Sequence, residues 1–160
     1  MKPLLNTTLL FFLVIGFSGG VSGQDGPDFE ETKRLAERGS VIDQYNLGRM
    51  YNRGEEGVPR NEAEAVRWYM LAAEQGHGIA QKNLGEMYDR GEGVPQNNLR
   101  AYVWMSVSAA EQGYGLVHDV LTSYRQRMRD RMAERLTPEL LARGQDMATR
   151  CFESDFQDCE

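Results

Sequence analysis

The chain of 160 residues offers few side chains whose types and spacing could support catalysis or metal binding. Downstream of residue 23 its two histidines, His77 and His118, stand apart, and neither lies in a His-Glu-x-x-His zinc motif. The same region has no Cys-x-x-Cys pair, no Gly-x-Ser-x-Gly nucleophile turn, no Ser-x-x-Lys pair and no phosphate-binding glycine loop. We therefore predict that the protein is not an enzyme and has no catalytic residue, no metal and no cofactor.

One pair of reactive groups has a suggestive spacing: Cys151 and Cys159 lie eight positions apart near the C-terminus. Thiols outside the cytoplasm tend to be oxidised, and the export signal described below places the chain there. We therefore expect a disulfide that closes the C-terminal tail. Free thiols or an intermolecular bond are the alternatives.

The strongest concentration of basic charge is a run of four arginines: Arg125, Arg127, Arg129 and Arg131. On a helix, steps of two residues spread these side chains over two sides, and Asp130 and Glu134 interleave with them. The pattern favours a solvated, salt-bridged face. A nucleic-acid site is disfavoured because the chain is acidic overall, with a formal net charge of −6.

Residues 1–23 have the layout of a secretory signal peptide. Lys2 provides a basic start, Leu9–Phe17 is an unbroken apolar run, and small residues follow up to Gly23. Cleavage after Gly23 predicts an exported bacterial protein, periplasmic or extracellular, with no integral membrane span. An uncleaved membrane anchor is the alternative, but the apolar run is short for one. Removing the leader removes one Lys and no acid, which leaves 17 basic and 24 acidic residues.

An internal repeat organises the rest of the chain. Residues 46–51 read NLGRMY, and residues 83–88 read NLGEMY, at an offset of 37. A turn rich in Gly and Glu that ends in Val-Pro follows each copy, and Trp68 and Trp104 come next at an offset of 36. Each copy closes with Ala-Ala-Glu-Gln-Gly, at 72–76 and 109–113.

Each copy predicts two helices joined by a turn. Ser40 with Asp43 is the expected start of the first helix, and Asn61 is the expected cap of the second. Gly48 and Gly85 fall inside the first helices, where Gly costs about 1 kcal/mol relative to Ala, so we expect a neighbouring helix to pack too closely for a side chain. The positions that we assign to repeat packing are Leu47, Gly48, Tyr51, Gly54, Trp68, Leu84, Gly85, Tyr88, Gly91 and Trp104. One such hairpin cannot bury its apolar side alone, so the units must stack.

These motifs resemble the Sel-one-like repeat (SLR) family, a relative of the tetratricopeptide repeats. The resemblance implies an all-α, right-handed α/α superhelical solenoid of helix-turn-helix units. It divides the chain into a half-repeat helix at 24–39, repeats at 40–76 and 77–113, and capping helices at 114–160. We expect a long helix from about Leu116 to Arg135 there, with Val120 among its buried residues. Asp43 and an inserted residue near Ser106 depart from the family pattern.

The resemblance also implies a scaffold or adaptor that binds a protein or peptide of unknown identity and acts as a monomer. First helices of successive units line a concave surface in tetratricopeptide-like stacks. The candidate groove residues on these helices are Tyr45, Arg49, Asn52, Lys82, Glu86 and Asp89. They differ between the two repeats, which fits a ligand surface and fits an unselected solvent face equally well. The alternative function is a cell-wall-related hydrolase with penicillin-binding or β-lactamase-like activity, which the missing nucleophile–base arrangement disfavours.

Overall fold

The computed structural model describes residues 28–55, 57–110 and 116–159, so the predicted leader lies outside the described residues. Every regular element in these ranges is an α-helix, as the repeat motif predicted. The helices are α1 (Phe29–Glu37), α2 (Val41–Arg53), α3 (Glu62–Ala73), α4 (Gly78–Arg90), α5 (Asn98–Ala110), α6 (Leu116–Ala133) and α7 (Pro138–Glu153). None of these seven helices has the length and hydropathy needed to cross a membrane.

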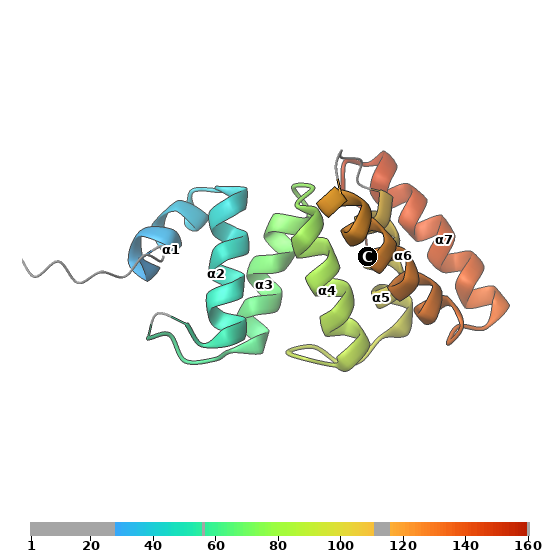
Figure 1. The fold of residues 1–160 in the computed structure, drawn as a ribbon, viewed down its shortest axis with the longest axis horizontal. Helices are drawn as coiled ribbons and strands as arrows, with labels where there is room; N and C mark the ends of the chain where they lie inside the picture. Colours follow the sequence, from blue (N-terminus) through green and yellow to red (C-terminus); the bar gives the residue numbers. More distant parts are fainter. Residues whose placement is uncertain (1–27, 56, 111–115, 160) are drawn as a thin grey trace, which may run out of the picture.

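Helices α1 to α5 follow one another along the long axis of the molecule (Figure 1). Helices α2 and α3 form one hairpin, α4 and α5 form the next, and α3 packs against α4. Helix α1 packs on α2, in the place that the second helix of a preceding unit would take. The chain is therefore an all-α helical repeat solenoid that begins with a half unit and ends with two further helices.

Polar side chains and glycine set the ends of the repeat helices. The Asn61 side chain accepts a hydrogen bond from the Glu64 backbone N–H at 3.1 Å and so caps α3, as predicted. Gly54 ends α2 in the left-handed conformation, with φ of 71°, which glycine adopts without strain. Ser40 precedes α2 at the N-cap position, as predicted, but its side chain does not cap the helix. Its hydroxyl donates to the Asp43 carboxylate, and the side chain accepts no hydrogen bond from the backbone of α2.

In each hairpin, one glycine lies where the two helices pack too closely for a side chain. A Cβ placed on Gly48 would lie 2.6 Å from Cδ1 of Tyr69, and one on Gly85 would lie 2.9 Å from Cγ of Met105. Both distances are shorter than a packed side chain tolerates. The predicted reason for a helical glycine is therefore confirmed in both repeats.

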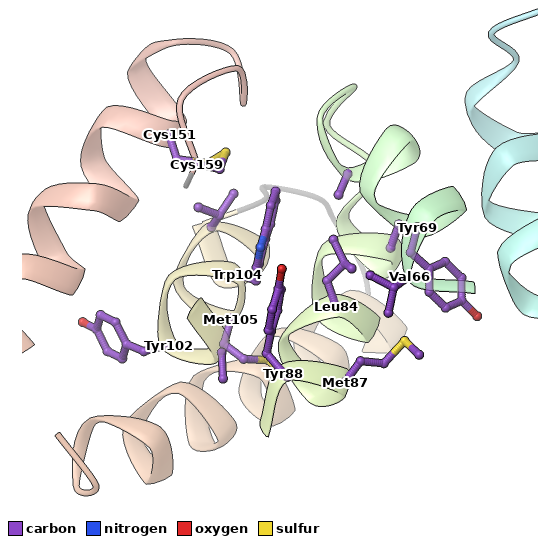
Figure 2. Close-up of a cluster of buried hydrophobic side chains, with 14 of the residues drawn as sticks. Val66, Tyr69, Leu84, Met87, Tyr88, Tyr102, Trp104, Met105, Cys151 and Cys159 are labelled. Atoms are coloured by element: carbon purple, nitrogen blue, oxygen red, sulfur yellow. A yellow bond between two sulfur atoms is a disulfide. The ribbon is translucent and has the colours of Figure 1, made fainter. Parts of the chain in front are cut away.

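The two tryptophans belong to two clusters of buried side chains. Trp68 packs with Ala36 of α1 and Leu47 of α2, so it joins the half unit to the first hairpin. Trp104 is fully buried in a larger cluster that extends from α3 to α7. The same cluster contains Tyr88, Cys151 and Cys159, which are drawn with Trp104 in Figure 2.

A hydrogen bond that the sequence reasoning missed joins each first helix to the helix before it. The side-chain amide of Gln44 donates to the Ala36 carbonyl at 3.2 Å, and that of Gln81 donates to the Ala73 carbonyl at 3.1 Å. Both glutamines are buried, and both carbonyls lie in the last turn of a helix, where each also accepts a backbone N–H from the following turn, that of Gly39 or Gly76. The offset is 37 for both members of the pair, so the repeat copies a polar contact as well as an apolar core.

Helices α6 and α7 both pack against α5 and enclose it together with α4. Thr137 caps α7 by accepting a hydrogen bond from the Leu140 N–H at 3.3 Å, with Pro138 in the first turn. Gly144 lets α7 approach α5, because a Cβ there would lie 2.8 Å from Cδ1 of Tyr102. The pair therefore covers the last repeat helix from two sides.

The buried side of α6 differs from the predicted one. The spacing predicts Val120 in the core and Arg125 on the solvated basic face, and both predictions are wrong. Val120 is exposed, whereas Arg125 is buried and its Nη1 donates to the Ser108 carbonyl at 3.2 Å. Ser108 lies in the last turn of α5, where carbonyls lack helical partners, and this contact fixes the rotation of α6.

The chain after α7 folds back onto the connection between α3 and α4. The sulfur atoms of Cys151 and Cys159 lie in bonding contact and both residues are buried, so the pair is able to form the predicted disulfide. The ring of Phe156, between the two cysteines, packs against Gly76. The cysteine pair thus holds the tail on the junction between the two repeats.

Candidate interaction surface

One side of the first helices carries all six predicted groove residues. Positions at i, i+3, i+7 and i+10 share one side of a helix. We call this side the first-helix face and define it by Ile42, Tyr45, Arg49 and Asn52 on α2 and by Ile79, Lys82, Glu86 and Asp89 on α4. The two isoleucines belong to it by the same spacing, although the sequence reasoning did not name them.

On α2 the first-helix face is built around stacked rings. Tyr45 stacks on His77, with ring centroids 4.6 Å apart and an interplanar angle of 19°, and its ring lies 5.9 Å from that of Tyr69. His77 is held in place because its Nδ1 accepts a hydrogen bond from the Ala80 N–H at 3.2 Å, at the start of α4. The half-buried Tyr45 therefore ties the first repeat to the second.

Beneath this face, Tyr69 of α3 places a buried hydroxyl between α2 and α4. The side-chain amides of Asn83 and Asn52 hydrogen-bond to it. Burial raises the pKa of Tyr69 to about 12, and the two amides offset part of that shift. The Arg49 guanidinium lies 3.1 Å from the Glu55 carboxylate. Asn52 and Arg49 are therefore engaged within the first repeat.

On α4 the predicted groove residues contact α6. Nζ of Lys82 lies 2.9 Å from Oε1 of Glu86, and the Tyr124 hydroxyl donates to the same oxygen at 2.8 Å. Asp89 pairs with Arg135, just beyond the end of α6. The side chains of Lys82, Glu86 and Asp89 are only 21%, 14% and 14% exposed. We call Lys82, Glu86, Asp89, Tyr124 and Arg135 the α6 latch, because their charged and hydroxyl groups hold α6 on the second repeat.

The protonation of Tyr124 suits this arrangement. Burial raises the pKa of its hydroxyl, and the hydrogen bond to the Glu86 carboxylate raises it further. The Lys82 ammonium lies 5.5 Å from the centre of the Tyr124 ring, over its face. Tyr124 therefore remains a hydrogen-bond donor to Glu86 over the physiological pH range.

Three aliphatic side chains, two on the first helices and one on α6, are left open to solvent. Ile42 is 66% exposed, Ile79 is 40% exposed and Val120 is 67% exposed. Val120 lies one helical turn before Tyr124 of the α6 latch, so it is on the side of α6 that faces α4. A depression of about 270 Å³ lies next to Ile79 and is lined by Val41, Gln75, Gly76, His77, Gly78 and Ile79.

The family model of the Sel1 repeat matches residues 42–77 and 78–114. The chain is a Sel1-repeat protein. The sequence placed the two repeats at 40–76 and 77–113, which differs from the matched ranges by one or two residues at each end.

The fold is similar to that of a protective antigen present in uropathogenic Escherichia coli strains, which displays an SLR fold. The two chains are 26% identical with a TM-score of 0.68, over 80% of this chain and 26% of that chain. This chain thus spans about a quarter of that protein's length. A Sel1 repeat protein from Oxalobacter formigenes is 27% identical, over 73% of this chain and 96% of that chain, with a TM-score of 0.47. The search of curated proteins found no match.

In this Sel1-repeat protein the residue types that could do chemistry have structural surroundings. His77 serves as a helix cap and a stacking partner, and the side chain of His118 lies outside the described residues. Within the ranges that the structure describes, no three His, Cys, Asp or Glu side chains gather so that they could hold a metal ion. Each first helix instead exposes one aliphatic side chain near its start, Ile42 on α2 and Ile79 on α4.

The two exposed isoleucines could have been recognised from the sequence. Ile42 and Ile79 occupy the second position of α2 and α4, at the same offset of 37 as the packing residues. An isoleucine that recurs in register but lies off the Leu47–Tyr51 side of the helix could have been assigned to the first-helix face. The burial of Lys82, Glu86 and Asp89 could not, because it depends on α6, which follows the repeat motif only loosely.

Proposed function

We propose that this protein is an exported scaffold that binds a protein or peptide through the first-helix face. Sel1-repeat proteins generally mediate protein–protein interaction. The observation that carries the proposal is the row of exposed aliphatic side chains, Ile42 and Ile79, which begins successive first helices. Together with Tyr45 they form the apolar part of a face whose charges are mostly paired within the chain. Aromatic and aliphatic anchors that exclude water supply most of the affinity in protein interfaces.

Within this proposal the six predicted groove residues take different roles. Tyr45 offers a half-buried ring to a partner, and Arg49 and Asn52 border it. Lys82, Glu86 and Asp89 shape the face indirectly, because they hold α6 in place. Substituting them would weaken binding by displacing α6 and not by removing a contact to the partner.

Export is supported by two features. Residues 1–23 combine a basic start, an apolar run and small residues, as a secretory leader does. The cysteine pair in bonding contact suits an oxidising compartment such as the periplasm or the cell exterior. A hydrolase gains no support, because the cysteines lie in α7 and the tail and are used in packing.

The two ends of the array support a monomer. Helix α1 turns Glu30, Glu31 and Arg34 outward, and α7 does the same with Arg143 and other charged residues. Such charged outer faces disfavour stacking of one chain onto the next. Sedimentation at micromolar concentration should give the mass of one chain.

Affinity capture from bacterial envelope extract tests the proposed surface. The bait is the mature chain, compared with Ile42→Asp/Ile79→Asp and with Leu140→Asp, which places the same charge on an exposed aliphatic position of α7. Proteins recovered by the wild type and the Leu140 variant should be lost from the Ile42/Ile79 variant. Recovery of the same proteins by all three baits would show that the first-helix face is not the binding surface.

A further inference from the structure

The side of α6 that carries Tyr124 combines exposed apolar and basic groups. Val120, Tyr124, Arg127 and Arg131 follow at i, i+4, i+7 and i+11 and therefore share one side of the helix. Val120 and both arginines are exposed. Because Tyr124 contacts Glu86 of α4, this side of α6 adjoins the first-helix face and extends it by one further helix.

Among the described residues, the acidic side chains on α4 form ion pairs within the chain, whereas two arginines on α6 do not. Glu86 is engaged by Lys82, Tyr124 and Arg90, and Asp89 is engaged by Arg135. By contrast, neither Arg127 nor Arg131 forms an ion pair with any side chain in the part of the chain that the structure describes.

The acids that the sequence placed around these arginines do not neutralise them. Asp130 pairs with its neighbour Arg129, and no ion pair joins Glu134 to a described residue. The prediction from the sequence that Arg127 and Arg131 belong to a salt-bridged face is therefore wrong. Two guanidinium groups one turn apart are open to solvent on a protein that is acidic overall.

This pattern of groups specifies the chemistry of a ligand. An exposed guanidinium has a planar set of donors that matches a carboxylate, and its charge is retained at every physiological pH. The exposed aliphatic groups of Val120, Ile79 and Ile42 suit aliphatic side chains, which a nucleic acid lacks. Complementary charge beside an apolar strip fixes orientation and register as well as attraction.

Resting on the proposed function, we infer that the partner segment is an acidic peptide with aliphatic side chains. Its carboxylates contact Arg127 and Arg131 on α6, and its aliphatic groups lie on Val120 and Ile79. The acidic end of the segment lies over the C-terminal half of α6, because both arginines follow Val120 along that helix. The α6 latch keeps this row beside α4, so the site requires both the second repeat and α6.

Peptide binding measured by fluorescence anisotropy tests the inference on the mature, oxidised chain. The acidic probe is a labelled peptide with two leucines three positions apart followed by four glutamates. One comparison probe carries four lysines in place of the glutamates, and a second is a single-stranded DNA oligonucleotide of similar charge. The variants are Arg127→Gln/Arg131→Gln, the charge reversal Arg127→Glu/Arg131→Glu, and the control Arg38→Gln/Arg143→Gln, which removes the same charge elsewhere.

The wild type and the control should bind the acidic peptide about tenfold more tightly than the lysine peptide, since two exposed charge pairs form with the first and none with the second. The glutamine variant should lose this preference, and the charge reversal should invert it. Equal affinity for both peptides, a preference that survives in the glutamine variant, or tighter binding of the oligonucleotide would overturn the inference.

Envelope capture with the same variants separates this inference from the proposed function. A partner lost from Ile42→Asp/Ile79→Asp but retained by Arg127→Gln/Arg131→Gln would leave the first-helix face as the binding surface and remove its preference for acidic segments. Loss from both variants, but not from the controls, supports both claims.

Discussion

The Tyr124 hydroxyl donates a hydrogen bond to the Glu86 carboxylate across 38 positions of sequence, at 2.8 Å. Glu86 stands on the first helix of the second repeat, and Tyr124 stands on the helix that follows that repeat. The contact shows how a helix that departs from the repeat motif is fixed to the array. It also shows that a residue on the first-helix face can hold a neighbouring helix in place.

The α6 latch should contribute measurable stability. Replacing Tyr124 by Phe removes the hydrogen bond to Glu86 and leaves a partly buried carboxylate with one partner fewer, which should lower the free energy of unfolding by about 1 kcal/mol. Urea denaturation measures the change, and hydrogen exchange should quicken in α6 before it does in α2. Glu64→Gln, which breaks an exposed pair with Arg67, serves as the control and should change stability by much less.

Replacing either helical glycine by alanine should destabilise the protein, whereas the same change at an open helix position stabilises it. Gly→Ala in an unobstructed helix stabilises by about 1 kcal/mol. Gly48→Ala should instead destabilise by about 1–3 kcal/mol, because the new Cβ meets the rigid ring of Tyr69 at 2.6 Å. Gly85→Ala should cost less, because the flexible Met105 side chain can move. Thermal melts decide the order, and a rise in melting temperature for Gly48→Ala would mean that α2 and α3 do not approach so closely.

Alkaline pH should weaken the fold through Tyr69. Its pKa is raised from 10 to about 12 by burial, so between these values the folded state keeps a proton that the unfolded state has lost. Stability from this group is complete below pH 10 and is lost as pH rises to about 12, by about 2–3 kcal/mol in total. Tyr69→Phe should flatten this part of the pH profile, whereas Tyr51→Phe should keep it. A slope unchanged by Tyr69→Phe would show that another group controls alkaline unfolding.

The cysteine pair should stabilise the end of the array. Closing a loop of this length contributes about 2–3 kcal/mol by restricting the unfolded chain. Cys151→Ser/Cys159→Ser should unfold at lower urea concentration and lose the contact of Gln157 with the Glu74 carbonyl, seen as faster exchange in the tail. Exported wild-type protein should show no free thiol after denaturation. Labelling of both cysteines would exclude the disulfide.

The sequence was sufficient to predict the repeats because their residues act locally and recur in register. Gly48 with Gly85 and Leu47 with Leu84 give the helices, the turns and the stacking without knowledge of distant contacts. The same logic applied to α6 failed, because its rotation is set by Arg125 reaching the Ser108 carbonyl and by Tyr124 reaching Glu86. Neither contact has a counterpart in the repeat motif.

The sequence predicted where the candidate surface lies but not which of its side chains are exposed. Helical spacing placed Tyr45 and Lys82 on one side of successive first helices, where they lie. How far each of those side chains is exposed depends on what packs beside it: Lys82 lies against Tyr124 of α6, and the equivalent Tyr45 stacks on His77. Exposure of this kind arises from tertiary packing and cannot be read from spacing alone.

Site-specific photo-crosslinking in living cells tests the central claim most directly. A benzophenone amino acid is placed singly at Ile42 and Ile79 on the first helices and at Val120 on the adjoining side of α6, and at Arg67 of α3 and Leu140 of α7 as controls. The same protein adduct should form from the first three positions and from neither control. Adducts that form only from α3 or α7, or equally from all five positions, would contradict the assignment of the first-helix face as the binding surface.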